Sequence, residues 1–469
     1  MKTTIFSNKY LLSFFGGCLF LLSSCIKDLD FASSADLKWS KDTVYFDTIF
    51  TRDKTTGYPI SVTKLISIKN PENRWVKADF SVVGGKNSPF SINIDGLAGP
   101  EITGLEIAPK DSVFVFVQCR LQANNQTQPA LVLDSLYARV GNKQSKLMLA
   151  AYGWDAHYVK DTVFPANTTW SDQVKPYVII GAAVVAPGRT FRINPGVKVY
   201  ASAQTVLYVL GDLQLNGTAQ NRITIKGDKP VSSTEKLPNQ WGGIWFLPGG
   251  KGNIEYSDIT NASVGLRADS TGCNNAPCVN LAQTRIQYCG TACLIGLGGA
   301  INAENCLFAD AGTYTFLAYF GGKYEFNNCT FVDYSNFGNR QDGSFAVTNT
   351  YRDGNGKLLA SNDLDLKITN SIVWGYKIDE MTTDKVTQSA WSISDENNYF
   401  KSKNENNHWN KTSNIFNRDP LFENISNGDY QLKSTSPAIS SANISTASLI
   451  DILGKQRKST PDLGAYEKF

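Results

Sequence analysis

The sequence predicts an all-β protein in which a β-sandwich is followed by a parallel β-helix, that is, a solenoid of short strands. Three observations support this. Residues 192–226 hold three short runs of alternating, often β-branched apolar residues, separated by turn residues that leave no room for a helix. A four-residue pattern then recurs five times up to residue 373. Residues 41–158 read as roughly seven strands broken by turn clusters, which is typical of a sandwich.

The first 24 residues form a targeting segment rather than part of the fold. Lys2 and Lys9 give a basic start, and an apolar core over 10–22 leads to the sequence Leu-Ser-Ser-Cys ending at Cys25. A secretory peptide without lipid and a membrane helix are the alternatives, but the apolar run is short for a span. The segment resembles the bacterial lipobox, whose cysteine becomes the lipidated first residue.

That resemblance implies a signal peptide over 1–24, a lipidated tether over 25–40 and attachment to a membrane through lipid on Cys25. The acids Asp28 and Asp30 resemble the surface-export signals of Bacteroidetes lipoproteins. The implied location is the outer membrane of a Gram-negative bacterium, on the cell surface. The sequence does not determine the oligomeric state.

The predicted sandwich, 41–158, contains a single cysteine, Cys119, so it has no disulfide of its own. Three of its stretches, 46–50, 107–112 and 149–153, resemble an immunoglobulin-like domain of the kind that precedes β-helices in Bacteroidetes lipoproteins. We therefore expect an immunoglobulin-like fold here, and burial of the Cys119 thiol as a small apolar group.

The predicted β-helix covers 176–403. The recurring pattern ends at residues spaced by 27, 22, 23 and 42 positions; the first three spacings suit one coil each, and the last fits two coils or one coil with an insertion near 336–365. Residues 192–226 resemble the first coils of right-handed parallel β-helix proteins. The pattern ends at Ile259, Ile286, Phe308, Phe331 and Val373.

Alternation within this pattern predicts which side chains share a face. Small residues should form one inward column and the pattern's last residues the next. Asparagines at one corner should form a side-chain ladder. The inward column comprises Ser257, Thr284, Cys306, Cys329 and Ser371, and the corner comprises Asn305, Asn328 and Asn370.

Residues 404–469 depart from the repeat. Their ordered motifs, including Asp419-Pro420-Leu421-Phe422 and the terminal Asp462-Leu463-Gly464-Ala465-Tyr466-Glu467, resemble the C-terminal segment of bacterial surface β-helix proteins, although Ser440 stands where that family usually has aspartate. Because a solenoid ends in unpaired strands, we interpret this segment as a cap that covers them.

Cysteines suggest two kinds of site. Cys306 and Cys329 could be a metal or redox pair, but the repeat itself demands small residues there, which favours packing. Cys273 and Cys278 lie in a turn-rich segment, where a disulfide is the better interpretation in an oxidising compartment and no second cysteine pair or histidine favours a metal.

Acidic residues give the best candidates for catalysis. Asp310 and Asp333 each follow a column cysteine by four residues and should lie in register on adjacent coils, where two carboxylates could hold Ca²⁺. The sequence favours the alternative that both are solvated corner acids. With only two histidines and no acid triad or Lys/Arg pair on one column, we assign no catalytic residue, no metal site and no cofactor. Charged residues of the insertion, such as Arg340 and Asp342, are expected to be solvated.

The sequence favours binding over catalysis. A near-neutral chain argues against nucleic acid, with 45 Lys plus Arg against 42 Asp plus Glu. Alternation should leave Trp245 and Trp374 on the outside, with Tyr376 nearby, where aromatic rings could stack on sugars; packing of Trp245 under a loop is an equal alternative. The hypothesis is a surface lipoprotein whose β-helix binds glycan, or another surface ligand, without turnover. A polysaccharide lyase or hydrolase is the second hypothesis, and a structural subunit of an envelope assembly is the third.

Overall fold

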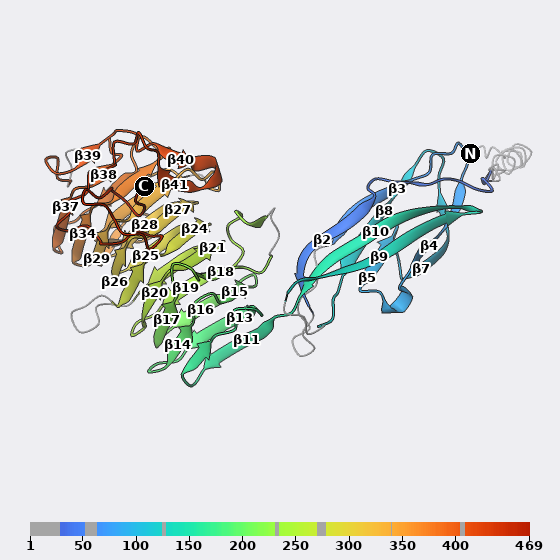
Figure 1. Ribbon diagram of the computed structural model, residues 1–469, viewed down its shortest axis with the longest axis horizontal. Coiled ribbons are helices and arrows are strands. Elements are labelled where there is room, and N and C mark those ends of the chain that lie inside the picture. Colours follow the sequence, from blue (N-terminus) through green and yellow to red (C-terminus); the bar gives the residue numbers. More distant parts are fainter. Residues whose placement is uncertain are drawn as a thin grey trace, which may run out of the picture. The chain divides into compact units, whose positions relative to one another are not determined.

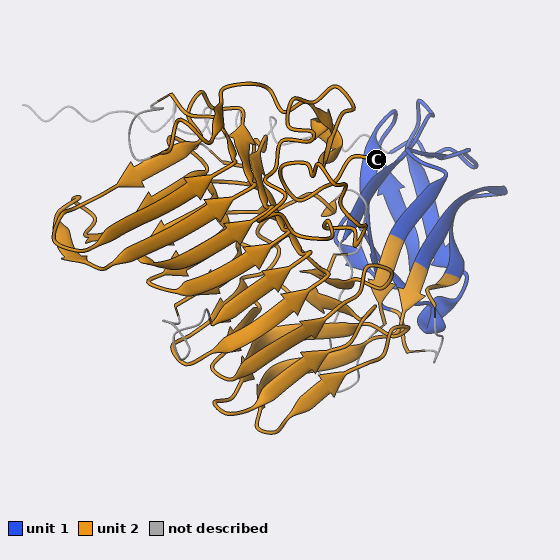
Figure 2. Ribbon diagram, turned by 60° about the vertical axis from the view of Figure 1, so that its left-hand side comes forward, with its two compact units in different colours: residues 1–46, 60–120, 132–151 blue, residues 47–59, 121–131, 152–469 orange. Residues whose placement is uncertain are grey.

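The computed structural model describes residues 29–51, 63–123, 128–229, 234–269, 278–338, 340–403 and 409–469. Strands are their main secondary structure, and the chain divides into two compact units, residues 1–46, 60–120 and 132–151, and residues 47–59, 121–131 and 152–469 (Figure 2). No helix among the described residues is long and apolar enough to cross a membrane. Cys25 and Cys273 lie outside the described residues, so the predicted anchor is not part of this description.

The first unit contains two five-stranded sheets. Their strand orders are β1-β3-β8-β5-β6 and β2-β10-β9-β4-β7, with β2, β9 and β10 running on into the second unit. Ring contacts between Phe46 and Phe90, and between Trp39 and Phe80, join the two sheets at 6.0 and 6.3 Å between ring centroids. Paired sheets agree with the predicted sandwich, and its immunoglobulin-like character stays a prediction. The strands are β1 (Lys38–Trp39), β2 (Thr43–Phe50), β3 (Lys64–Lys69), β4 (Val76–Val82), β5 (Phe90–Ile94), β6 (Leu97–Ala98), β7 (Glu101–Ile107), β8 (Ser112–Cys119), β9 (Ala130–Val140) and β10 (Lys143–Trp154), with a 3-10 turn, η2 (Gly85–Asn87).

The second unit is a parallel solenoid in which successive strands of a coil join three ladders, named A, B and C here (Figure 1). Ladders B and C meet at β13, which pairs with both β15 and β16. Parallel pairing begins before residue 176, the predicted start of the solenoid, because β11 and β12 already pair in parallel with β13 and β14. Long parallel sheets confirm the solenoid class, and its right-handedness stays a prediction.

The ladders have these members. Ladder A is β12 (Thr168–Trp170), β14 (Thr190–Ile193), β17 (Asp212–Asn216), β20 (Lys251–Glu255), β23 (Val279–Ala282), β26 (Ala300–Glu304), β29 (Gly322–Asn327), β34 (Leu364–Thr369) and β37 (Trp391–Glu396). Ladder B is β15 (Lys198–Ala201), β18 (Ile223–Gly227), β21 (Ser257–Thr260), β24 (Arg285–Cys289), β27 (Leu307–Ala311), β30 (Thr330–Asp333), β35 (Ile372–Gly375), β38 (Tyr399–Phe400) and β39 (Ile415–Phe416). Ladder C is β11 (His157–Phe164), β13 (Tyr177–Val185), β16 (Val206–Val209), β19 (Gly243–Phe246), β22 (Val264–Ala268), β25 (Ala292–Leu297), β28 (Tyr314–Tyr319), β31 (Phe345–Thr348) and β36 (Met381–Asp384).

The core is built from inward columns, one residue per coil. In ladder B the predicted register is confirmed: Ile259, Ile286, Phe308, Phe331 and Val373 pair in that order and are fully buried. The small residues of the neighbouring column are also fully buried. Stacking of Phe308 on Phe331, with 4.9 Å between ring centroids, fills the space that small neighbours leave.

The insertion near 336–365 belongs to a single coil. β30 pairs directly with β35, so the 42-residue spacing reflects one coil with an insertion. It contains β31 and an antiparallel hairpin of β32 (Thr350–Arg352) and β33 (Leu358–Ser361). Of the two predicted alternatives, two coils or one coil with an insertion, the pairing of β30 with β35 supports the second.

The corner asparagines do not form the predicted ladder. Asn305, Asn328 and Asn370 all have φ near +50°, a left-handed conformation that asparagine tolerates better than most residues. Most of their side-chain bonds go to the C-terminal segment: Asn328 accepts from the Ser448 amide at 2.9 Å, and Asn370 from the Asn443 amide at 2.8 Å. The corner therefore binds a distant part of the chain.

Within the predicted cap, 404–469, the segment 419–469 lies against ladder B rather than over the end of the solenoid. It carries β40 (Phe422–Asn424), η4 (Ile425–Asn427) and β41 (Asp429–Leu432), and then runs back along ladder B. The Ala465 amide bonds the Thr330 hydroxyl at 3.0 Å, and Arg457 donates to Asn305 at 2.8 Å. Buried outward residues of ladder B pack against buried residues of the segment. Those of ladder B are Leu307, Ala309, Val332, Ile372, Trp374 and Tyr399, and those of the segment are Phe422, Tyr430, Leu432, Ala438, Ile452, Leu463, Ala465 and Tyr466.

Trp409, which lies within the predicted cap 404–469, packs in the core near the end of the solenoid. This residue contacts Phe345 and Phe400, at 6.4 and 5.4 Å between ring centroids, and is largely buried. One aromatic side chain thus joins β31 of ladder C and β38 of ladder B, the strands just before the last strand of each ladder.

Candidate functional site

Ladder A has the outer face that suits a polar ligand. Ladder B lies under the C-terminal segment, whereas the outward column of ladder A is polar at every described coil. This column, named the polar row here, has one side chain per strand in direct register, and all of them are at least partly accessible to solvent. It consists of Thr169, Arg192, Gln214, Asn253, Asn280, Asn302, Glu325, Lys367 and Ser394.

Neighbouring amides of the polar row bond one another. Asn253 donates to the Gln214 side chain at 3.4 Å, and Asn280 donates to Asn253 at 3.2 Å. Because each amide carries two donor hydrogens and an acceptor oxygen, such bonds orient the groups and leave further donors and acceptors facing solvent. The row is therefore an ordered set of hydrogen-bonding groups spaced by about 4.8 Å, the distance between strands.

A groove of about 340 Å³ lies where the polar row meets the C-terminal segment. Its floor includes Asn302, Glu325 and Lys367 of the row. Thr446 forms a wall, because its carbonyl accepts from the Asn327 side chain at 2.8 Å. Glu304 is also held in place, since Ser448 donates to its carboxylate. The groove thus offers carboxylate, amide, hydroxyl and ammonium groups together.

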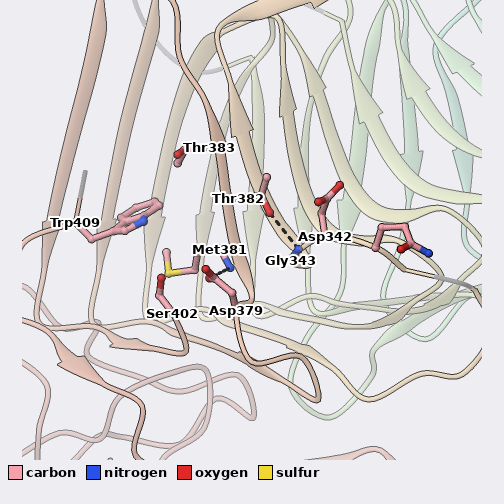
Figure 3. A pocket seen from close by; sticks show the side chains of 9 residues that line it. Asp342, Gly343, Asp379, Met381, Thr382, Thr383, Ser402 and Trp409 are labelled. Carbon is pink, nitrogen blue, oxygen red and sulfur yellow. Dashed lines mark hydrogen bonds between the residues drawn. The ribbon is translucent and has the colours of Figure 1, made fainter. Parts of the chain in front are cut away.

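A second hollow, the end pocket, lies beside Trp409 and has a volume of about 360 Å³. Figure 3 shows Trp409 on one side and Asp342 on the other, with Asp379, Met381 and Thr382 between them. The Gly343 amide bonds the Thr382 hydroxyl at 3.1 Å, and the Met381 amide bonds Asp379 at 3.2 Å. These bonds fix the loops that carry the two aspartates.

Behind the end pocket is a buried charge cluster of Arg340, Asp333 and Glu380. Arg340, which the sequence suggests is solvated, is 3% exposed. Its guanidinium bonds both Glu380 oxygens, one at 3.0 Å, and lies 3.5 Å from Asp333. Glu380 also accepts from the Ser344 and Lys377 amides. Burial raises the pKa of Asp333 to about 7, against the lowering effect of Arg340.

Asp310 and Asp333 are not the solvated corner acids that the sequence favours, because both are buried. They lie on the adjacent strands β27 and β30, directly after the paired residues Ala309 and Val332. Each has its own partner: the Tyr430 hydroxyl donates to Asp310 at 2.5 Å, whereas Asp333 faces Arg340. Burial raises the pKa of Asp310 to about 6. The Ca²⁺ hypothesis gains no support, since the described residues contain no group of three or more potential metal ligands.

The predicted aromatic platform is only partly available. Trp374 does point outward but is 5% exposed, because the C-terminal segment covers it; the prediction of an exposed ring there is wrong. Trp245 points outward and is partly accessible, with the Arg267 guanidinium 5.1 Å from its ring centroid and the Tyr208 ring against it. Tyr376 is exposed, with Arg340 4.7 Å from its ring centroid. Sugar stacking at Trp245 and Tyr376 stays a prediction.

The cysteines follow the packing interpretation. Cys306 and Cys329 form no disulfide and, like Cys119, are fully buried; burial raises the pKa of the Cys329 thiol. Cys278 is disulfide-bonded, and its partner lies outside the described residues. Pairing with Cys273 stays a prediction.

Comparisons with known proteins add little to this description. No family model and no curated protein matches the chain. A structure of XylC in complex with xylose matches at 10% identity and a TM-score of 0.35, over 91% of this chain and 88% of that one. The catalytic domain of a GH87 α-1,3-glucanase with nigerose matches at 9% identity and a TM-score of 0.17, over 73% and 82%. The E. coli chaperone DraB matches at 9% identity and a TM-score of 0.18; 26% of this chain is covered, and the match spans about half of the chaperone (55%). At these scores no property of those proteins transfers to this chain.

Sequence reasoning missed the polar row. Its signal was present, because every strand of ladder A alternates apolar and polar residues, as in Asp212-Leu213-Gln214-Leu215-Asn216. The recurring pattern used for registration lies in ladder B, so the strands of ladder A were never aligned with one another. From β14 onward, each ladder A strand comes just before a ladder B strand in the sequence. Aligning the ladder A strands by that position places Asn253, Asn280 and Asn302 in one column.

Proposed function

We propose that this protein is a lipid-anchored surface protein whose solenoid binds an extended neutral glycan along the outer face of ladder A without cleaving it. The observation that carries the proposal is the polar row, which repeats ordered hydrogen-bonding groups from coil to coil. Sugar hydroxyls both donate and accept hydrogen bonds, as amide side chains do. A polymer of sugar units lying along the solenoid would meet a similar group at each step.

The charges of this face favour a neutral polymer over a polyuronate. Outward side chains of the described ladder A strands carry more acids than bases, so a polyanion would meet net repulsion. The acids are Asp212, Glu255, Glu304, Glu325, Asp365 and Glu396, and the bases are Arg192, Lys251, Lys323 and Lys367. The groove beside Thr446 would hold the best-enclosed sugar units, because it has both a floor and a wall.

The anchor part of the proposal rests on the lipobox-like sequence that ends at Cys25. Cys25→Ala should release the protein from membranes, because one residue would carry the lipid. Protein that still pellets with membranes in high salt after this substitution would contradict the anchor. The immunoglobulin-like first unit would then serve as a spacer between bilayer and solenoid.

Binding is tested on a panel of neutral and uronate polysaccharides by calorimetry, with product analysis on the same samples. We expect binding to neutral glycans that falls at least tenfold in the triple variant Asn253→Ala, Asn280→Ala, Asn302→Ala. Asn355→Ala is the control, because this asparagine is exposed in the hairpin turn away from ladder A. Equal binding by the triple variant would contradict the assigned face.

Product formation would support the hydrolase or lyase hypothesis instead. In that event, the end pocket becomes the site to examine, because Asp342 and Asp379 are the two carboxylates that share one hollow there. If Asp342→Asn and Asp379→Asn each abolished turnover but kept glycan binding, the protein would be an enzyme with its active site in the end pocket. Absence of binding to every glycan would favour a structural role in the envelope.

A further inference from the structure

The first unit carries an exposed apolar patch on the outer face of one sheet. Leu65 on β3 pairs directly with Phe116 on β8, and Phe114 lies two residues before Phe116 on the same face. The three side chains are 53%, 40% and 59% exposed. Direct pairing makes them one contiguous surface, which we name the phenylalanine patch.

This patch breaks the alternation of its own strands. Ile66, Val115 and Val117 point inward and are buried, so the outward positions between them are those where an antiparallel sheet normally places polar residues. Contiguous exposed apolar side chains on a soluble domain mark an interaction surface. The outer face of this sheet therefore carries an apolar patch among polar neighbours such as Ser67 and Asn93, which pair with Phe114 and Phe116.

Chain connectivity identifies that partner as a lipid surface. The edge strand β1 pairs with β3, the strand that carries Leu65. Cys25 precedes Lys38 of β1 by 13 residues, a length that spans at most roughly 45 Å. A lipid on Cys25 would therefore keep this sheet next to the bilayer.

The charges at the edge of the patch suit the same partner. Lys38 and Lys69 pair in register and both are exposed, so two ammonium groups lie on the face that bears the patch. Lys38 also contacts Asp36 at 2.7 Å, but both side chains are more than half exposed, which leaves the lysine open to other anions. Phosphate groups of lipids would meet these lysines while the phenylalanines enter the apolar layer.

We propose that the phenylalanine patch is a second membrane contact, which lays the first unit against the bilayer once the lipid has tethered it. The inference rests on the proposed anchor at Cys25 for its orientation, but the patch itself is testable without the anchor. Weak affinity is sufficient, because tethering raises the local concentration of the second contact.

The test uses the unlipidated chain from residue 26 onward, floated with vesicles of phosphatidylethanolamine and phosphatidylglycerol. We expect the wild-type chain to float with the vesicles. In the triple variant Leu65→Ser, Phe114→Ser, Phe116→Ser, the fraction of protein that floats should be at least tenfold lower. Leu133→Ser with Met148→Ser is the matched control, because these are exposed apolar residues of the other sheet, and it should float like the wild type.

Failure of the wild-type chain to float would overturn the lipid proposal and assign the patch to a protein partner. The lipid proposal would also be overturned if the triple variant floated like the wild type, or if the control variant lost flotation to the same extent as the triple variant. Phe114→Lys alone is a second probe, since an exposed position accepts lysine without loss of fold. Failure of the anchor shows in a different experiment, the membrane pelleting of Cys25→Ala, so the two outcomes are separable.

Discussion

Replacing Arg340 by methionine will destabilise the end of the solenoid by about 3–5 kcal/mol, the cost typical of removing one partner from a buried ion pair. The structure supports this figure because the Arg340 and Glu380 side chains are 2% and 0% exposed. Without the guanidinium, Glu380 keeps two backbone amide donors but loses its counter-ion, and Asp333 loses the charge that favours its ionised form. The double variant Arg340→Met, Glu380→Gln should recover part of the loss, because glutamine keeps an acceptor for the amides and carries no charge.

Local unfolding can be followed by alkylation of Cys329, which is buried on the same coil as Asp333. Urea titration with mass-spectrometric detection of the labelled thiol gives the opening free energy of that coil. Cys293 serves as a reference farther from the end. A change below about 1 kcal/mol in Arg340→Met, the range of an exposed pair, would refute the claim that these charges are buried and interdependent. The same claim would be refuted if the double variant Arg340→Met, Glu380→Gln were less stable than Arg340→Met alone.

Three further outcomes follow from the buried groups. Burial raises the pKa of Asp333 to about 7, so the folded chain holds this proton more tightly than the unfolded chain does; stability should fall as pH rises from about 4 to about 7. Asp333→Asn should flatten that slope in urea midpoints measured at each pH. The thiols of Cys306 and Cys329 should resist alkylation in the native protein, and Cys306→Asp should lower the melting temperature sharply, because a lone charge would enter the core. Rapid native labelling would contradict the inward register. Asn328→Ala should cost about 1–3 kcal/mol and increase proteolysis near Ser448, because it removes a hydrogen-bond partner of that amide and a residue that tolerates a left-handed φ.

The register of ladder B was predictable because it depends on local alternation repeated at coil spacing. Cys306 and Phe308 differ by two positions and must share a face, and their counterparts 23 residues later must lie above them. Packing then fixes the rest, since a one-residue slip would turn Phe331 out of the core. The same spacing logic indicated an insertion near 336–365, because the 42-residue interval exceeds one coil.

The burial of Arg340 could not be predicted in that way. Its partner, Glu380, is 40 residues away and follows a different strand, so no local pattern connects the two. Within the sequence, Arg340 stands among glycine, asparagine and aspartate, which is the composition of a solvated loop. Only the return of the chain to the same edge of the solenoid brings the charges together.

The course of the C-terminal segment shows how a motif-based expectation can differ from the observed placement. Its motifs were matched to a capping role because a solenoid has an end to cover. In the structure Trp409, at the start of the predicted cap, packs near that end, whereas 419–469 covers ladder B, whose outward residues Leu307, Val332 and Ile372 are apolar. Those residues were visible in the sequence, directly before or after inward ones. Because a strand that is apolar on both sides needs cover on both sides, their presence already required a second layer on ladder B, and 419–469 was the part of the chain left to supply it.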